Sequence, residues 1–206
     1  MPSIGLFGGT FDPIHSGHLH IARSFADELR LDSVIFLPAG DPYHKTAPRT
    51  PAAHRLAMAE IATQADPRFA VSDCDIVRQG ATYTHDTVQI FRQHFPAADL
   101  WLLVGIDSLL QLHTWHRWQS LVRQCRIAAA PRPGSSLAQA PAQLQAWLAE
   151  ALPQGWLHIL QAAPLPASST QIRQQLAASG TSPDLPPAVL AYIRQHHLYH
   201  IPPRAR

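Results

Sequence analysis

Two histidines three residues apart close a short glycine-containing segment near the start of the chain. Residues 8–18 read GGTFDPIHSGH and lie between an apolar run, 4–7, and an amphipathic stretch, 19–29. Backbone N–H groups of small residues can approach an anion closely, and a helix start adds unpaired amides and the positive end of its dipole. The pattern therefore predicts a phosphate-binding loop between a strand and a helix.

His15 and His18 give this loop a chemistry beyond anion binding. Their ring N–H groups can donate to phosphate oxygens as negative charge grows on those oxygens during a reaction. The segment matches neither the dinucleotide-binding fingerprint nor the P-loop pattern. We interpret the histidine pair as catalytic, and we expect Thr10 and Asp12 to hold the backbone of the loop through hydrogen bonds.

Six apolar runs typical of strands alternate with helical patterns. The runs span 4–7, 34–37, 69–77, 100–104, 127–130 and 157–160. Apolar residues at helical spacing, such as Leu19, Ala22 and Phe25, keep one face of the first intervening helix apolar. This alternation predicts the α/β class, with a doubly wound, Rossmann-like parallel sheet and helices on both faces, and with ligands beyond the carboxyl ends of the strands.

A second helix start with anion-binding character follows the last apolar run. Ser168, Ser169 and Thr170 precede an amphipathic pattern that ends at Gly180, so hydroxyls and free N–H groups are expected to gather there. The other polar motifs also follow predicted strands, which places them at one edge of the sheet. They are the glycine loop, His44 with Lys45, Thr82 to Thr84, and Gly105 to Asp107. Because all of these motifs are expected at the same edge of the sheet, they indicate a single active site.

Composition and charge exclude several classes of protein. The 206 residues carry Pro and Gly spread along the chain, which predicts one domain over 1–206. The net charge of +2 without a Lys/Arg cluster predicts no nucleic-acid partner, and no run approaches the ~18 apolar residues of a membrane span. A strand predicted directly after Ser3 leaves no room for a signal peptide, so we expect a cytoplasmic protein. Cys74 and Cys125 are expected to be buried thiols.

The loop at 8–18 resembles the signature of the HxGH nucleotidyltransferases. Later segments are similar in order and spacing to one family of that group, the bacterial nicotinate mononucleotide adenylyltransferases. These segments are DPYHK at 41–45, RQGATYT at 78–84, GIDSL at 105–109, Trp115, and SSTQIR at 168–173. The resemblance runs from Gly5 to Tyr199 and implies transfer of AMP from ATP to nicotinate mononucleotide, giving deamido-NAD and pyrophosphate in NAD biosynthesis.

The resemblance also implies roles for individual residues. The implied catalytic residues are His15, His18, Lys45 and Arg173. The implied ATP contacts are Gly8, Gly9, Thr10, Phe11, His15, His18, Gly105, Asp107, Ser168, Ser169, Thr170 and Arg173, with the helices from about residue 169 closing the ATP side. The implied mononucleotide contacts are His44, Lys45, Thr84, Trp115 and His116, with the Trp115 ring stacked on the pyridine. We expect Mg²⁺ to arrive with ATP and no metal site in the protein itself, because no acidic cluster lies near these loops.

Two other readings stay open at this stage. A phosphopantetheine adenylyltransferase would share the first motif, although such enzymes typically have Thr at the position of His15 and lack the Trp115 segment. A nucleotide-sensing module with an inactive site is the second alternative, and the intact pair of His15 and His18 argues against it. The sequence leaves a homo-oligomer open as well.

Overall fold

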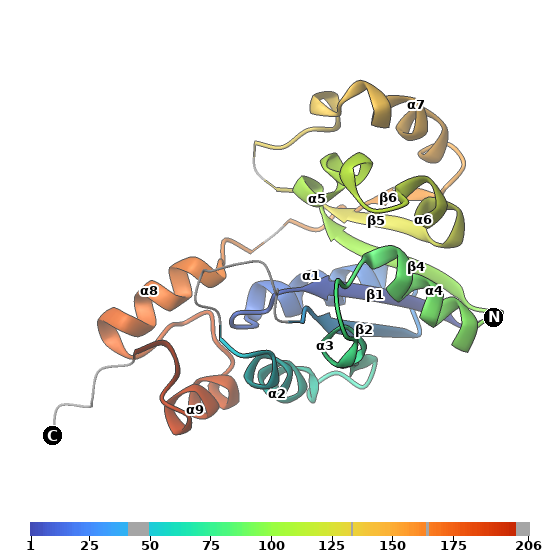
Figure 1. Cartoon of the computed structure of the whole chain (residues 1–206). Helices are drawn as coiled ribbons and strands as arrows, with labels where there is room; N and C mark the ends of the chain where they lie inside the picture. Colours follow the sequence, from blue (N-terminus) through green and yellow to red (C-terminus); the bar gives the residue numbers. More distant parts are fainter. Residues whose placement is uncertain (41–49, 133, 164, 201–206) are drawn as a thin grey trace, which may run out of the picture.

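The computed structural model describes residues 1–40, 50–132, 134–163 and 165–200. Within these ranges, six parallel strands form one sheet in the order β3-β2-β1-β4-β5-β6 (Figure 1). The strands are β1 (Ser3–Gly9), β2 (Ser33–Pro38), β3 (Phe69–Val71), β4 (Asp99–Gly105), β5 (Arg126–Ala130) and β6 (Leu157–Ile159). The strand order reverses between β1 and β4, as in doubly wound sheets. The predicted fold class is confirmed.

Helices cover both faces of this sheet. The α-helices are α1 (Ser16–Glu28), α2 (Ala52–Thr63), α3 (Cys74–Val77), α4 (Thr84–His94), α5 (Ile106–Leu110), α6 (Trp118–Gln124), α7 (Ala142–Ala151), α8 (Ser169–Ser179) and α9 (Pro187–Gln195). Three short 3-10 turns are η1 (Leu112–Thr114), η2 (Leu137–Gln139) and η3 (Leu198–His200). Side chains that alternate along each strand divide the core between the two faces, because successive residues of a strand point to opposite sides.

Each face has its own apolar cluster. Phe7, Phe36 and Leu103 pack with residues of α1, α2, α8 and α9 on one side of the sheet. Leu6 and Leu102 pack with residues of α4, α5, α6 and α7 on the other side. Two rigid layers therefore support the carboxyl edge of the sheet, where the loops after β1 and β4 meet.

The strand predicted over 69–77 is wrong in its second half. Pairing with β2 ends at Val71, and the residues from Cys74 to Val77 form the helical turn α3. The Ser72 hydroxyl accepts the backbone N–H of Cys74 at 3.3 Å, and the Asp73 carbonyl accepts those of Ile76 at 2.7 Å and Val77 at 3.0 Å. The Ser72 side chain thus bonds the nearby backbone, and the backbone bonds to the Asp73 carbonyl close a helical turn, so the strand ends before Cys74.

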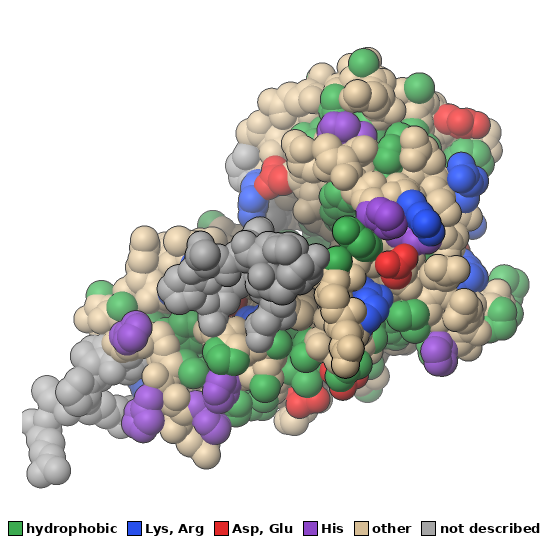
Figure 2. Space-filling view, in the orientation of Figure 1, with side chains coloured by type: hydrophobic (Ala, Val, Ile, Leu, Met, Phe, Trp, Pro, Cys, Tyr) green, Lys and Arg blue, Asp and Glu red, His purple; other side chains and the backbone are tan. Residues whose placement is uncertain are grey.

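Two observations bear on the predicted class of protein. In the described part of the chain, no helix combines the length and apolar character needed to cross a membrane. On the face shown in Figure 2, Lys and Arg side chains are interspersed with Asp and Glu and form no single basic patch. Cys74 and Cys125 are both free thiols; Cys125 is buried as predicted, whereas Cys74 is only half-buried.

Candidate active site

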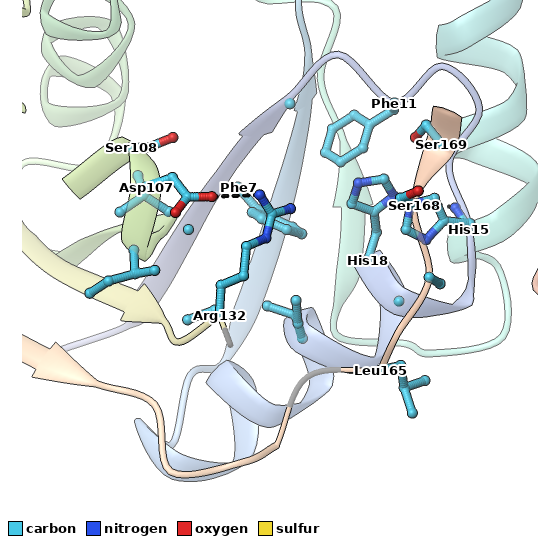
Figure 3. Close-up of a pocket in the computed structure, with 18 of the residues that line it drawn as sticks. Phe7, Phe11, His15, His18, Asp107, Ser108, Arg132, Leu165, Ser168 and Ser169 are labelled. Atoms are coloured by element: carbon cyan, nitrogen blue, oxygen red, sulfur yellow. Dashed lines mark hydrogen bonds and ion pairs between the residues drawn. The ribbon is translucent and has the colours of Figure 1, made fainter. Parts of the chain in front are cut away.

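A cavity of about 770 Å³ lies at the carboxyl edge of the sheet. Its walls come from the ends of β1, β4 and β5, the first turns of α1 and α5, and the segment that leads into α8 (Figure 3). This is the place where the strand order reverses, and it is where ligands bind in doubly wound sheets. The volume falls in the range of pockets that hold small molecules, roughly 300 to 1,000 Å³.

Most of the predicted ATP contacts line this cavity. The lining residues among them are Gly8, Gly9, Phe11, His15, His18, Gly105, Asp107, Ser168, Ser169 and Thr170. Thr10 and Arg173 lie beside it and hold its walls. The Thr10 carbonyl accepts from Arg55 Nη1 at 2.9 Å, and Arg173 donates to the Asp12 carbonyl at 2.7 Å. Segments far apart in the sequence thus meet at one cavity.

The two glycines after β1 serve different purposes. A Cβ on Gly8 would meet no protein atom within 4 Å, whereas a Cβ on Gly9 would lie 2.8 Å from the Phe11 ring. Gly9 is therefore required by the packing of Phe11. Gly8 leaves open space against its backbone, which suits the close approach of a ligand.

His15 and His18 stack on each other at the start of α1. Their ring centroids are 3.8 Å apart, and the two planes are inclined by 30°. The backbone N–H of His15 donates to Nδ1 of His18 at 3.3 Å. Because Nδ1 of His18 is an acceptor, the proton of the neutral ring is placed on Nε2, which makes Nε2 the donor. Figure 3 shows the His18 ring next to Phe11, with Ser168 and Ser169 of the α8 start close by.

Burial keeps both rings in the neutral form. Desolvation lowers the pKa of His15 to about 4, and His15 is only 4% exposed. Desolvation also lowers the pKa of His18 well below 6.5, and the neighbouring charge of His15 adds to this effect. At neutral pH the pair therefore offers N–H donors to an anion and carries no positive charge of its own.

The pKa of His15 predicts a dependence of stability on pH. The folded protein resists protonating His15 until about pH 4, while the unfolded chain accepts that proton near pH 6.5. The stability that the neutral His15 ring confers is therefore fully present above pH 6.5. The free energy of unfolding decreases by about 3 kcal/mol from this residue as the pH drops from 6.5 to 4. Urea unfolding of wild type and His15→Gln at several pH values measures it. The variant should lose less stability than wild type between pH 7 and 4, and parallel curves would contradict the lowered pKa.

Asp12 holds the loop through a distant partner. It is 7% exposed, and its Oδ1 accepts from the Tyr199 hydroxyl at 2.6 Å. The sequence predicted that the Asp12 side chain would bond the backbone of its own loop. The predicted partner is wrong. The buried carboxylate instead binds a hydroxyl 187 residues later in the chain, in η3.

The predicted mononucleotide contacts form a second group. The Tyr83 ring, at the start of α4, stacks on His116 with 4.3 Å between centroids, which brings Thr84 close to the segment after η1. Trp115 is half-buried against the core on that side of the sheet. None of Thr84, Trp115 and His116 lines the cavity described above. His44 and Lys45 lie outside the described residues.

Arg132 is a cavity residue that sequence reasoning missed. It follows β5 and pairs with Asp107 (Figure 3). Asp107 also accepts from the Ser135 hydroxyl at 2.8 Å. The available signal was the position of Pro131 and Arg132 directly after an apolar run. Among the described residues, no group of three or more His, Cys, Asp or Glu side chains is arranged to hold a metal ion.

The chain is similar to known proteins along nearly its whole length. The model of the cytidylyltransferase-like family matches residues 6–175. A probable nicotinate-nucleotide adenylyltransferase of Neisseria meningitidis is 63% identical over 199 residues, which cover 97% of this chain and 99% of the relative. A probable nicotinate-nucleotide adenylyltransferase of Chromobacterium violaceum is 44% identical over 95% of this chain and 98% of the relative.

Solved structures share the fold. Nicotinic acid mononucleotide adenylyltransferase of Plasmodium falciparum complexed with NaAD aligns with a TM-score of 0.74 at 17% identity, covering 98% of this chain and 99% of that chain. The same protein complexed with APC gives a TM-score of 0.73 at 16% identity, over the same shares. At this level of identity the likeness supports the architecture of the chain.

Proposed function

Because the chain belongs to the nicotinate-nucleotide adenylyltransferase family, within the cytidylyltransferase-like group, we propose that it transfers AMP from ATP to nicotinate mononucleotide. The products are deamido-NAD, a precursor of NAD, and pyrophosphate. One structural observation supports the proposal most strongly. The neutral, stacked pair of His15 and His18 lies at a helix start, in the wall of a cavity large enough for a nucleotide.

ATP fits the chemistry of the cavity walls. We assign the triphosphate to the space between the starts of α1 and α8, where Gly8, Gly9 and the hydroxyls of Ser168 to Thr170 lie. Arg173 is at the border of this space and also bonds Thr170 Oγ1 at 3.2 Å, so its guanidinium is close enough to share a phosphate. Gly105 and the pair of Asp107 and Arg132 would face the nucleoside.

The second substrate belongs at the neighbouring group of residues. We assign the pyridine ring to Trp115 and the nicotinate carboxylate to the backbone N–H groups near Thr84 and His116. The stacking of Tyr83 on His116 supports this assignment, because it joins the two segments in one place. Lys45 and His44 complete the site in the proposal, with the Lys45 charge beside the mononucleotide phosphate.

The reaction needs no protein nucleophile. A phosphate oxygen of nicotinate mononucleotide attacks the α-phosphorus of ATP in line. The bond from that phosphorus to the oxygen it shares with the β-phosphate breaks, and this oxygen leaves with pyrophosphate. The phosphate monoester is already an anionic nucleophile, so the protein has to bring two anions together and offset the charge that shifts. His18 Nε2–H and the His15 ring donate to the α-phosphate, while Lys45, Arg173 and the α8 start stabilise the phosphates.

Magnesium fits this scheme as part of the nucleotide. The carboxylate that lines the cavity, Asp107, is already paired with Arg132, and the described residues form no metal cluster. A paired carboxylate without further acidic groups suits an ion that is held mainly by the triphosphate. When bound, Mg²⁺ would offset part of the phosphate charge.

The proposal covers the chain as one catalytic unit over 1–206. Apolar residues of α8 and α9 share a core with those of α1 and α2, which supports the expected role of the C-terminal helices in closing the ATP side. We place the reaction in the cytoplasm, where ATP is available, with no nucleic-acid or membrane partner. A homo-oligomer is compatible with this proposal.

Pyrophosphate release with a panel of acceptors tests the substrate assignment. ATP and Mg²⁺ are supplied with nicotinate mononucleotide, nicotinamide mononucleotide or phosphopantetheine in separate reactions. Nicotinate mononucleotide should give the highest kcat/KM. Turnover with phosphopantetheine instead would favour the related adenylyltransferase, and nucleotide binding without pyrophosphate release would favour a sensing module.

Trp115→Ala should raise KM for both pyridine mononucleotides and preserve the preference for the acid. Wild type favours nicotinate because its carboxylate accepts from N–H donors, whereas the amide presents an NH₂ group to them, and such mismatches cost up to about 10⁴-fold. Stacking is worth roughly 1 to 3 kcal/mol for either ring. Competition assays on wild type, Trp115→Ala and Trp147→Ala, a control on α7, give the ratios. A ratio that collapses in Trp115→Ala would contradict a pure stacking role.

A further inference from the structure

The C-terminal turn η3 reaches back to the loop that carries the histidine pair. We propose that Tyr199 is a positioning residue for AMP transfer, because its hydroxyl fixes Asp12 and thereby sets the loop from Phe11 to His15. The inference rests on the proposed function, because its test measures kcat for AMP transfer. Tyr199 lies 15 positions beyond Asp184, whose carbonyl accepts from the first residue of α1, Ser16.

The bond between Tyr199 and Asp12 is short and sheltered. The hydroxyl donates to Oδ1 at 2.6 Å, and Asp12 is 7% exposed. Burial and the Asp12 carboxylate both raise the pKa of Tyr199, so its hydroxyl stays protonated and remains a donor. A hydrogen bond to a buried carboxylate is among the stronger ones that a neutral donor makes.

Asp12 is also joined to the ATP side of the cavity. Its backbone carbonyl accepts from Arg173 Nη1 at 2.7 Å. The next carbonyl, that of Pro13, accepts from the Ser169 hydroxyl at 3.1 Å. The Ser16 N–H, at the first residue of α1, donates to the Asp184 carbonyl at 2.9 Å. The chain after residue 168 thus contacts this loop at Asp12 and Pro13 and the adjoining start of α1 at Ser16. Tyr199 adds a fourth contact, to the Asp12 carboxylate.

The backbone of η3 shows that contacts outside the turn hold it in place. Tyr199 has φ of 61° and the next residue, His200, has φ of 52°; His197, just before η3, also has φ of 52°. These values lie in the left-handed region, which is unfavourable for residues other than glycine. Local preference therefore does not explain the turn. The Tyr199 ring packs against the core, and its hydroxyl reaches Asp12.

Removal of the hydroxyl should affect the reaction more than the fold. The remaining bonds to Asp12, Pro13 and Ser16 keep the loop attached, but the Asp12 side chain loses its partner. His15 follows Asp12 by three residues, and its backbone N–H orients the His18 ring. A loop that moves by a fraction of an ångström misplaces both donors relative to the α-phosphate. The loss should therefore appear in kcat.

Tyr199→Phe, compared with Tyr192→Phe, tests the inference. Tyr192 lies on α9, and its hydroxyl bonds His54 Nδ1 at 2.9 Å, so the control also removes one hydroxyl contact from the C-terminal region. Tyr199→Phe should lower kcat about tenfold, the range expected for a hydrogen bond to a charged group, and change KM for nicotinate mononucleotide less than about twofold. Tyr192→Phe should leave kcat within about twofold. A kcat for Tyr199→Phe equal to that of the control would overturn the inference.

Asp12→Asn supplies a second measurement through the same bond. The amide keeps an Oδ1 acceptor, so its loss in kcat should be smaller than that of Tyr199→Phe. The double variant should be no slower than about the worse single variant, because both changes act on one contact. Losses that multiply would show independent effects and contradict the inference. Wild-type AMP transfer in the same assays checks the proposed function separately, since it does not depend on the ratio between variants.

Discussion

His18→Ala is expected to lower kcat for AMP transfer about 10²- to 10³-fold, the usual cost of one donor that acts on charge developing in a transition state. The Nε2–H of His18 is the donor placed against the α-phosphate, since its Nδ1 already accepts from the His15 backbone. KM for ATP should change much less, because the ground state has other phosphate contacts. Steady-state kinetics and thermal unfolding of the same preparations give both quantities.

His20→Ala is the matched control for this prediction. His20 is on the same helix, its ring bonds the Ala163 carbonyl at 2.8 Å, and neither residue lines the cavity. Its kcat should stay within about threefold of wild type, in the range of a single structural hydrogen bond. Equal losses in the two variants, or a normal kcat in folded His18→Ala, would remove His18 from the reaction.

Gly8→Ala is expected to raise KM for ATP about 10- to 100-fold while leaving the melting temperature near that of wild type. The added methyl group meets no protein atom within 4 Å, so the fold has no reason to change. In the ligand complex the same methyl group would separate a phosphate from backbone N–H groups, and charge-assisted bonds of this kind are worth about 1.5–3 kcal/mol. Steady-state kinetics with varied ATP and a thermal melt measure the two effects.

Gly9→Ala gives the contrasting result one residue away. Its Cβ would lie 2.8 Å from the Phe11 ring, so both stability and ATP binding should fall. Normal ATP affinity in Gly8→Ala would show that the triphosphate does not approach this strand end. The two neighbouring variants therefore separate a ligand contact from a packing contact.

The sequence predicted the features that local chemistry determines. Alternating apolar runs predicted the doubly wound sheet, and short polar residues at 8–18 and 168–170 marked the two helix starts at its edge. Apolar character alone could not define the end of β3, because Ile76 and Val77 suit a strand as well as the turn they form in α3. The hydrogen bonds of Ser72 and Asp73 decided between the two.

Contacts between distant residues account for most of what was missed. The partner of Asp12 is Tyr199, and the partner of Asp107 is Arg132, and no local pattern links either pair. The low pKa of His15 likewise depends on burial by the assembled walls of the cavity. Motif recognition found the donors, while their protonation and support follow from the tertiary structure.

The most direct test of the account follows the phosphate oxygens through the reaction. Nicotinate mononucleotide labelled with ¹⁸O on its phosphate is incubated with ATP, Mg²⁺ and the protein, and mass spectrometry detects the products. Direct attack by the mononucleotide predicts deamido-NAD that retains all of the label and pyrophosphate that contains none. Absence of the dinucleotide, or label in the pyrophosphate, would contradict the proposed transfer.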